Sequence, residues 1–173
     1  MGRDKVTLEF RGRSLAVWAA EALQSACVEV LVASGDARRL DWLGLPHVHD
    51  AVLDAGPLGG LVAGLEHASH ELVAVVAADM PFASADVLRL LAERWTGEDA
   101  VVPRTDRGIE PLHAVYSKSA APRLRAALEE GARAMHDVLG RLRVREVQEA
   151  EWREADPSGR LPFNVNRPKD LSR

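Results

Sequence analysis

The sequence predicts an α/β fold with a mostly parallel sheet. Apolar extended runs alternate with helical patterns along most of the 173 residues, which is the order of βαβ units. The run at residues 72–78 is wholly apolar and rich in valine, as in a strand that is buried on both faces. Two strand-like segments among short helices in the final third of the chain indicate that the sheet includes antiparallel strand pairing there. A chain of this length suits one domain, so we expect residues 1–173 to form a single domain.

The sequence of the N-terminal half predicts alternating strands and helices. Val6, Leu8 and Phe10 alternate with polar residues, as in a short strand, and a turn follows at residues 11–13. Ser14 can cap a helix over residues 15–26. The next predicted elements are a strand at 28–33, a short helix at 37–43, an edge strand at 47–50 and a helix at 58–68.

The C-terminal half continues this pattern. Ser84 can cap a helix over residues 86–94, and Gly131 can end a helix over 118–129. The other predicted elements are strands at 100–103, 111–116 and 143–147, a loop at 105–108, a short helix at 134–139, a short strand or loop at 163–166, and a terminal helix that begins at Pro168.

Asp79 directly follows the apolar run and precedes Pro81, which cannot continue a strand ladder. This places a carboxylate at the carboxyl end of a buried strand, where open α/β sheets bind their ligands. The alternative is a helix cap, but Ser84 stands nearer the next helix. We therefore interpret Asp79 as a functional residue.

A glycine-rich segment at residues 54–60 precedes a predicted helix. Glycines at the start of a helix allow close approach of the backbone to a ligand, and they also suit an ordinary tight turn. The sequence leaves both interpretations open.

Composition excludes several classes of function. The formal net charge of −4 and the lack of a long basic run argue against nucleic acid as a partner. Cys27 is the only cysteine, which excludes an internal disulfide and a cysteine-built metal site. No apolar run approaches the length of a membrane span, and no signal-peptide pattern is present. We expect a cytoplasmic protein without a membrane partner.

The histidines suggest no metal site. His67 and His70 would share a helix face, and His47 and His49 form a pair, but a zinc site requires more ligands. His113 lies within an apolar strand pattern and is interpreted as a satisfied core histidine. The chain has no nucleophile elbow, no complete Walker A loop and no G-x-G-x-x-G motif.

Several polar residues stand in apolar surroundings and are candidates for chemistry. A lysine and carboxylates around glycine loops suit phosphate chemistry, because Mg²⁺ prefers a few carboxylates plus substrate phosphates and lysine offers a compact positive charge. The candidates are Lys5, Asp50, Asp79, His113, Asn164 and Asn166.

Five short stretches together resemble the MobA-like family of molybdenum cofactor guanylyltransferases. Each is a weak signal alone, but all five occur in the family's order, and the last is the most specific. They are MGRDK (1–5), HD followed by GPLGGL (Asp50; 56–61), AADMPF (77–82), PLHAVY (111–116) and FNVNRPKDL (163–171).

The resemblance implies a three-layer α/β/α, Rossmann-like nucleotidyltransferase fold. It also implies transfer of GMP from GTP to the phosphate of molybdopterin, with release of pyrophosphate and a requirement for Mg²⁺. GTP, molybdopterin and molybdoenzyme maturation proteins are the implied partners. By position, Lys5 resembles the lysine that contacts the GTP phosphates, Asp79 the magnesium ligand and Asp50 an acid that contacts the nucleotide.

Two further parts of the family site have counterparts here. Asn164 and Asn166 resemble the pair near the acceptor phosphate or the metal. The segment that contains Gly56, Pro57, Leu58 and Gly59 is similar to one that lines the guanosine pocket. Two alternatives stay open: a sister enzyme that uses CTP or another phosphate acceptor, and a non-catalytic relative that binds nucleotide or a maturation partner.

The beginning of the chain departs from the family pattern. Family members open with a strand and a loop of the form L-A-G-G-x-S-x-R-M-G-x-D-K, and this sequence begins at the methionine of that motif. We therefore expect the first family strand, in the middle of the sheet, to be missing and to leave a gap. We hypothesise that Met1 is not the natural start. Ala33 stands where a family member can have asparagine, so we expect a nucleotide contact from Ser34 or from backbone.

Overall fold

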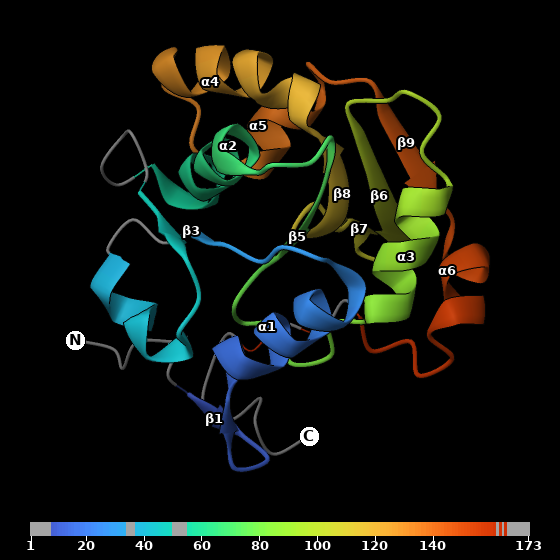
Figure 1. Ribbon diagram of the computed structural model, residues 1–173. Coiled ribbons are helices and arrows are strands. Elements are labelled where there is room, and N and C mark those ends of the chain that lie inside the picture. The colour runs from blue at the N-terminus through green and yellow to red at the C-terminus, as the bar shows by residue number, and fades with distance from the viewer. Residues whose placement is uncertain (1–7, 34–36, 50–54, 162, 164, 166–173) are drawn as a thin grey trace.

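The computed structural model describes residues 8–33, 37–49, 55–161, 163 and 165 (Figure 1). Its strands are β1 (Glu9–Phe10), β2 (Arg13–Ser14), β3 (Val32–Ala33), β4 (His47–Val48), β5 (Leu72–Val76), β6 (Ala100–Thr105), β7 (Gly108–Ile109), β8 (His113–Ser117) and β9 (Val144–Val147). Its helices are α1 (Leu15–Ala26), α2 (Gly56–His67), α3 (Ala85–Glu93), α4 (Ala121–Glu129), α5 (Met135–Leu139) and α6 (Glu149–Ala155), with 3₁₀ helices at Ala37–Leu43 and Lys118–Ala120.

The largest sheet has the strand order β5-β8-β6, with β7 and β9 also paired to β6. Strand β8 is antiparallel to both β5 and β6, whereas β9 is parallel to β6. Strands β5, β6 and β9 therefore run in one direction and β8 runs against them. The sequence predicts an antiparallel strand in the final third instead, and that prediction is wrong for the segment at 143–147, because β9 is parallel to β6.

Helices cover both faces of this sheet and give three layers (Figure 1). On one face α2, α4 and α5 pack against strand residues such as Val102 and Tyr116. On the other face α3 and α6 pack against Val101 and Val115, and the buried Trp152 of α6 lies in this cluster. The three-layer α/β/α architecture expected from the sequence is therefore present.

Helices with local sequence signals begin and end as predicted. Helix α1 spans the predicted residues, although the side chain of Ser14 makes no capping hydrogen bond. Helix α3 begins after Ser84, whose hydroxyl oxygen accepts a hydrogen bond from the backbone N–H of Val87 (3.3 Å). This hydroxyl satisfies one of the N–H groups that the first helical turn leaves without an intrahelical partner.

Two strand predictions are wrong for one physical reason, the first in the extent of the strand and the second in its burial. The strand predicted at 28–33 is reduced to β3, and Val28 is 91% exposed. Strand β5 has the predicted apolar residues, but all five are only half-buried. Both segments line a large cavity that lies between them, so each has an open edge rather than a neighbouring strand.

The described strands form separate sheets at this point. Strand β3 pairs with β4 in a parallel two-stranded sheet, and β5 belongs to the larger sheet. In the part of the chain that the structure describes, no ladder connects the two. The division falls where the resemblance implies a further strand.

Three smaller differences concern segments with weak patterns. Helix α2 begins at Gly56, two residues before the prediction, and Pro57 fits its first turn, where a missing N–H removes no helical hydrogen bond. The loop predicted at 105–108 is the turn of a hairpin between β6 and β7. Helix α6 was not predicted. The predicted terminal helix lies outside the described residues.

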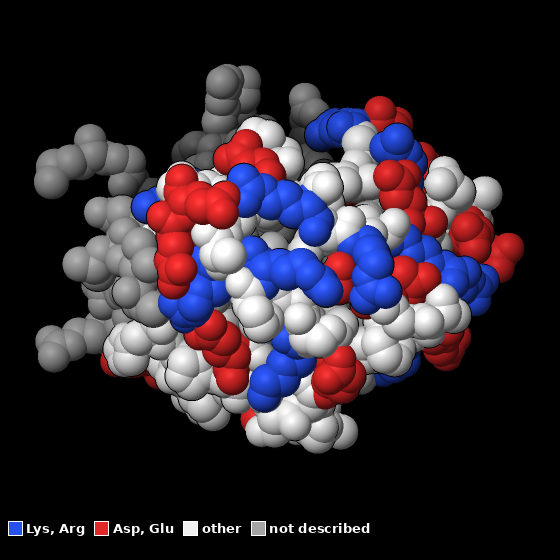
Figure 2. Space-filling view, turned by 90° about the horizontal axis from the view of Figure 1, so that it is seen from above, with Lys and Arg blue, Asp and Glu red and all other residues white. Residues whose placement is uncertain are grey.

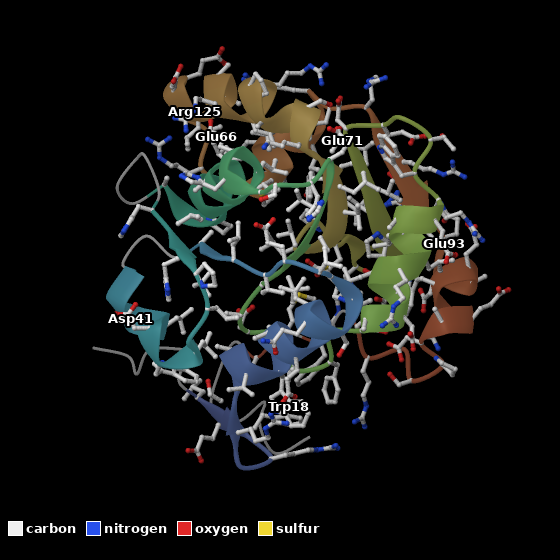
Figure 3. The ribbon with its side chains drawn as sticks, viewed as in Figure 1. Trp18, Asp41, Glu66, Glu71, Glu93 and Arg125 are labelled. Atoms are coloured by element: carbon white, nitrogen blue, oxygen red, sulfur yellow. The ribbon has the colours of Figure 1, made fainter. Side chains whose placement is uncertain are left out.

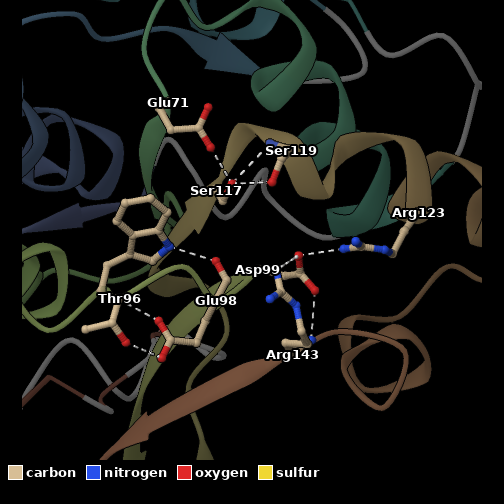
Figure 4. Close-up of polar contacts among 9 residues, drawn as sticks. Glu71, Thr96, Glu98, Asp99, Ser117, Ser119, Arg123 and Arg143 are labelled. Atoms are coloured by element: carbon tan, nitrogen blue, oxygen red, sulfur yellow. Dashed lines mark hydrogen bonds and ion pairs between the residues drawn. The ribbon is translucent and has the colours of Figure 1, made fainter.

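A network of polar side chains lies at the amino ends of β5 and β6 (Figure 4). Asp99 is 1% exposed, accepts a hydrogen bond from the backbone N–H of Arg143 (2.9 Å) and pairs with the side chain of Arg123 (2.5 Å). Burial opposes ionisation of Asp99, but the hydrogen bonds from Arg143 and Arg123 outweigh it and lower its pKa. Nearby, the Ser117 hydroxyl donates to Glu71 (2.6 Å). This network stabilises the end of the sheet opposite Asp79.

Ion pairs and mixed charges cover the outer surface of the α2 and α4 layer. Glu66 of α2 pairs with Arg125 of α4, and Figure 3 shows the two side chains directed at each other. The face seen in Figure 2 has basic and acidic side chains interspersed. Among the described residues, no helix is long and apolar enough to cross a membrane.

Candidate active site

Asp79 lies in a turn immediately beyond the carboxyl end of β5. Met80 N donates to the carbonyl oxygen of Ala77 (3.2 Å), and Ala83 N donates to that of Met80 (3.3 Å), so consecutive turns connect β5 to α3. The carbonyl oxygen of Asp79 accepts a hydrogen bond from Val165 N (3.1 Å). Val165 is therefore fixed against the turn that contains Asp79.

An aromatic cluster supports this turn from both ends of the chain. Phe82 makes edge-to-face contacts with Phe10 (ring centroids 5.3 Å apart) and with Phe163 (5.6 Å). Such contacts add stability beyond the apolar area that they bury. The β1–β2 hairpin and residues near the C-terminus thus converge beside Asp79.

Glu110 is a second acidic residue at this site, and the sequence analysis missed it. Its carboxylate accepts a hydrogen bond from Leu112 N (3.3 Å), and its own N–H donates to the carbonyl oxygen of Pro103 (2.9 Å). Burial raises the pKa of Glu110, and the nearby negative charge of Asp79 raises it further.

The sheet topology explains why these two acidic residues lie near each other. Strand β8 is antiparallel to β5, so the segment before β8 lies beside the segment after β5. A predicted strand at 111–116 next to the run at 72–78 would have placed Glu110 at the same edge as Asp79, but sequence alone does not give that pairing.

His113 is buried in β8 and anchors the start of α3. Its Nε2 accepts a hydrogen bond from Ser84 N (3.0 Å), and burial lowers its pKa to about 4. The ring is therefore neutral at pH 7, with its proton on Nδ1, which has no partner among the described groups. The predicted core position is confirmed, but only one ring nitrogen is satisfied.

The start of α2 separates two cavities. Gly56 and Pro57 line both the cavity between β3 and β5 and a second cavity of about 620 Å³. Gly56 has φ +62°, a conformation that favours glycine, and a Cβ there would lie 3.3 Å from the carbonyl oxygen of Arg133. Leu58 and Gly59 are buried and line neither of these cavities.

A close packing contact explains why glycine occupies position 60 in this segment. A Cβ on Gly60 would lie 3.2 Å from the carbonyl oxygen of Ala33, so glycine permits α2 to pack closely on β3. The glycine-rich segment therefore combines a close helix–strand contact with an opening onto two cavities.

The donor set at this edge suits magnesium better than zinc. Within the described ranges, no cluster of three or more His, Cys, Asp or Glu side chains could hold a metal ion. The predicted histidine pair on one helix face is absent, because α2 ends at His67 and His70 lies beyond it. Mg²⁺ commonly takes one or two carboxylates and completes its shell with phosphate oxygens and water, so Asp79 and Glu110 fit it.

Four predicted site residues cannot be placed in this geometry. Lys5, Asp50, Asn164 and Asn166 lie outside the described residues. Val165 stands between the two asparagines in the sequence, and its N–H is the donor to Asp79.

Comparison with known proteins identifies the family. A model described as "MobA-like NTP transferase domain" matches residues 1–147. The chain belongs to this family. The MobA-like family is one of nucleotidyltransferase enzymes, which agrees with acidic residues at the carboxyl end of β5 and with the three-layer fold.

Curated relatives carry names that agree with the family. The chain is 35% identical over 175 residues to a "probable molybdenum cofactor guanylyltransferase" of Pelotomaculum thermopropionicum, covering 99% of this chain and 83% of that protein. It is 42% identical over 127 residues to one of Methanosarcina mazei, covering 70% of this chain and 55% of that protein. The chain thus spans just over half of the latter.

Solved structures support the same fold. Molybdopterin-guanine dinucleotide biosynthesis protein A from Archaeoglobus fulgidus matches with a TM-score of 0.83 and 30% identity, over 99% of this chain and 88% of that chain. A 2-C-methyl-D-erythritol 4-phosphate cytidylyltransferase from Thermus thermophilus matches with a TM-score of 0.65 and 22% identity, over 97% and 90%, which supports the fold alone.

Proposed function

We propose that this protein transfers GMP from GTP to the phosphate of molybdopterin and releases pyrophosphate. An oxygen of the acceptor phosphate attacks the α-phosphorus of GTP, and the bond from that phosphorus to the oxygen bridging to the β-phosphate breaks. Both reacting phosphates are negatively charged, so the protein's task is to position them and to offset their charge. A cytoplasmic location belongs to the same proposal.

One observation carries the proposal. Asp79 follows β5 at the sheet edge where α/β folds bind ligands, and its turn is fixed by Val165. Glu110 lies close enough for the charge of Asp79 to raise its pKa. The named relatives supply the reaction class, and this pair supplies acidic groups where that reaction needs a cation.

Asp79 and Glu110 are the residues that would hold Mg²⁺ in this proposal. When bound, Mg²⁺ offsets the charge of the triphosphate and of the departing pyrophosphate. Lys5 would add a positive charge next to the GTP phosphates, and Asp50 would contact the nucleotide. No side chain has to act as a nucleophile.

The remaining predicted residues are assigned to the two substrates. Gly56 and Pro57 border both cavities and would line the guanosine pocket, whereas Leu58 and Gly59 are buried beneath them and border neither cavity. Asn164 and Asn166 would contact the acceptor phosphate.

A sister reaction with CTP, which the resemblance leaves open, is the second candidate. Pyrophosphate release should therefore be measured with molybdopterin, Mg²⁺ and either GTP or CTP. Faster release with GTP supports the proposal, and faster release with CTP contradicts its nucleotide assignment. Calorimetric binding of GTP without pyrophosphate release would instead support a non-catalytic nucleotide-binding protein.

A further inference from the structure

The ladder between β5 and β8 ends just before the two acidic residues of the proposed cation site. Its last register pair is Val76 with His113. Asp79 comes three residues after Val76, and Glu110 comes three residues before His113. Each of these short segments folds into a turn, so strand pairing no longer fixes one acid relative to the other. A different connection has to hold the two acids in place.

His113 supplies a connection between these two segments. Its Nε2 accepts a hydrogen bond from Ser84 N (3.0 Å), and Ser84 directly follows the turns that connect β5 to α3. The backbone N–H of the same histidine donates to the carbonyl oxygen of Glu110 (3.4 Å). One residue therefore bonds to both segments, through its ring to the segment after Asp79 and through its backbone to Glu110.

The His113 ring also lies close to the segment that leads to the C-terminal residues. Burial lowers the pKa of His113 most strongly, and the nearby negative charge of Asp156 opposes that effect. Asp156 follows α6, and its carboxylate accepts hydrogen bonds from Ser158 N (3.1 Å) and Ser158 Oγ (2.6 Å). The segment that begins there continues to Val165, the donor to Asp79. His113 thus lies beside three segments that converge on the site.

A buried histidine at this position carries a free-energy cost that packing alone does not explain. His113 is 0% exposed, and its Nδ1 has no partner among the described groups. Val115, on the same face of β8, belongs to an apolar cluster, so an apolar side chain would suit position 113 without burying an unpaired N–H. Capping of α3 does not explain the histidine either, because the Ser84 hydroxyl caps Val87 N.

We propose that His113 is a positioning residue of the cation site: its ring fixes the turn after β5, so that Asp79 and Glu110 stay close enough to hold one divalent cation. This inference rests on the proposed function, in which these two acids hold Mg²⁺. His113 acts through the backbone of the turn and touches neither cation nor substrate. Hydrogen bonds that orient metal ligands in this way typically contribute about 10–100-fold to metal affinity.

Two substitutions separate the reach of the side chain from its polarity. In His113→Gln the amide oxygen can take the place of Nε2 and accept from Ser84 N, whereas in His113→Asn the same amide is one methylene shorter and falls short of that N–H. Binding of Mn²⁺, which prefers the same oxygen ligands as Mg²⁺, is followed by the EPR signal of the free ion. We expect His113→Gln to bind Mn²⁺ within about twofold of wild type and His113→Asn to bind on the order of tenfold more weakly.

The same pair should differ in the Mg²⁺ dependence of pyrophosphate release. His113→Asn should need on the order of tenfold more Mg²⁺ for its half-maximal rate. Its rate at saturating Mg²⁺ should approach that of wild type, because the acids themselves are unchanged. A merely structural role would instead lower the rate by the same factor at every Mg²⁺ concentration.

Two controls separate positioning from general stability. Ser84→Ala removes the capping hydroxyl of α3 and keeps the N–H that bonds to His113. Asp99→Ala removes a buried hydrogen-bond acceptor at the opposite end of the sheet. Both variants should have lower melting temperatures than wild type and the wild-type dissociation constant for Mn²⁺.

The wild-type chain gives a further test that does not depend on the folding of any variant. If the His113–Ser84 hydrogen bond favours cation binding, cation binding must strengthen that bond by the same factor. Saturating Mg²⁺ should therefore slow hydrogen exchange of the Ser84 amide on the order of tenfold. The Arg143 amide, which bonds to Asp99, should show no change.

The Mn²⁺ measurement needs no turnover. A wild-type chain that gives the expected Mn²⁺ pattern but releases no pyrophosphate would contradict the proposed reaction and still support the positioning role. Four results would overturn that role: no Mn²⁺ binding by wild type, equal affinities of the Gln and Asn variants, an equally large loss of affinity in Ser84→Ala or Asp99→Ala, or Ser84 exchange that does not respond to Mg²⁺.

Discussion

Val165 donates its backbone N–H to the carbonyl oxygen of Asp79 over 3.1 Å, and its side chain is fully buried. The proposed magnesium ligand is therefore held by a residue near the C-terminus. Phe163 packs on Phe82 in the same place, so Phe163 and Val165 together act as a brace for the turn after β5.

The brace can be tested with two substitutions at one position. Val165→Ala keeps the N–H and loses packing, whereas Val165→Pro loses both. A net hydrogen bond contributes about 1 kcal/mol, so Val165→Pro should lower the free energy of unfolding by about that much more than Val165→Ala. Urea denaturation of the two variants measures the difference. Equal stabilities would show that the hydrogen bond to Asp79 contributes nothing.

Glu110 should make stability fall as pH rises. Its pKa is raised above the ordinary 4.5 in the folded state, by burial and then by Asp79. An acid whose pKa is higher in the folded state stabilises the fold at pH values below its unfolded-state pKa. That stabilisation is lost as pH rises through the folded-state pKa. Glu110→Gln cannot ionise, so it should gain stability relative to wild type above pH 4.5. A stability difference that does not change between pH 4 and 7 would contradict the shift.

His113 should make the free energy of unfolding fall as pH is lowered, which is the opposite of the effect of Glu110. Its pKa is lowered from 6.5 to about 4, so the neutral form that stabilises the fold is present above pH 6.5 and is lost as pH falls toward 4. The shift corresponds to about 3 kcal/mol of unfolding free energy lost over that range. His113→Gln should lack this loss, as measured by urea denaturation at several pH values. The same pH dependence in both proteins would refute the assignment.

Asp99 should matter for stability and not for the reaction. Asp99→Ala leaves Arg143 N and the Arg123 guanidinium without their buried partner, which should cost about 2–4 kcal/mol of unfolding free energy. Asp106→Ala, in the exposed turn between β6 and β7, is the matched control and should change stability little. Thermal and urea unfolding of the pair measure this. Equal stabilities would show that the Asp99 network is not structural.

Elements with strong local signals could be predicted from the sequence. Ser84 with its following apolar pattern gave the position of α3 to within a residue, and the periodicity of α1 gave its full extent. These elements depend on residues close in sequence. Asp79 was chosen as a candidate because a strand that ends in an acid is also a local pattern, and its role stays a prediction.

Features that depend on distant partners could not be predicted. β3 is short and β5 is half-buried because no described strand pairs with their facing edges, and nothing within 28–33 or 72–78 reports that. Glu110 carries no periodic signal, and it becomes a site residue only through the pairing of β8 with β5. Helix α6 is mostly polar and was overlooked, although Trp152 anchors it in the core.

The most direct test of the proposed reaction is pyrophosphate release from GTP, with molybdopterin and Mg²⁺, by wild type, Asp79→Asn and Asp106→Asn. We expect wild type and Asp106→Asn to release pyrophosphate at equal rates. Asp79→Asn should release pyrophosphate at least about 100-fold more slowly, because the site loses a charge that holds the cation. Its melting temperature should stay within a few degrees of the wild-type value. Full activity in Asp79→Asn, or no release of pyrophosphate by wild type, would contradict the account.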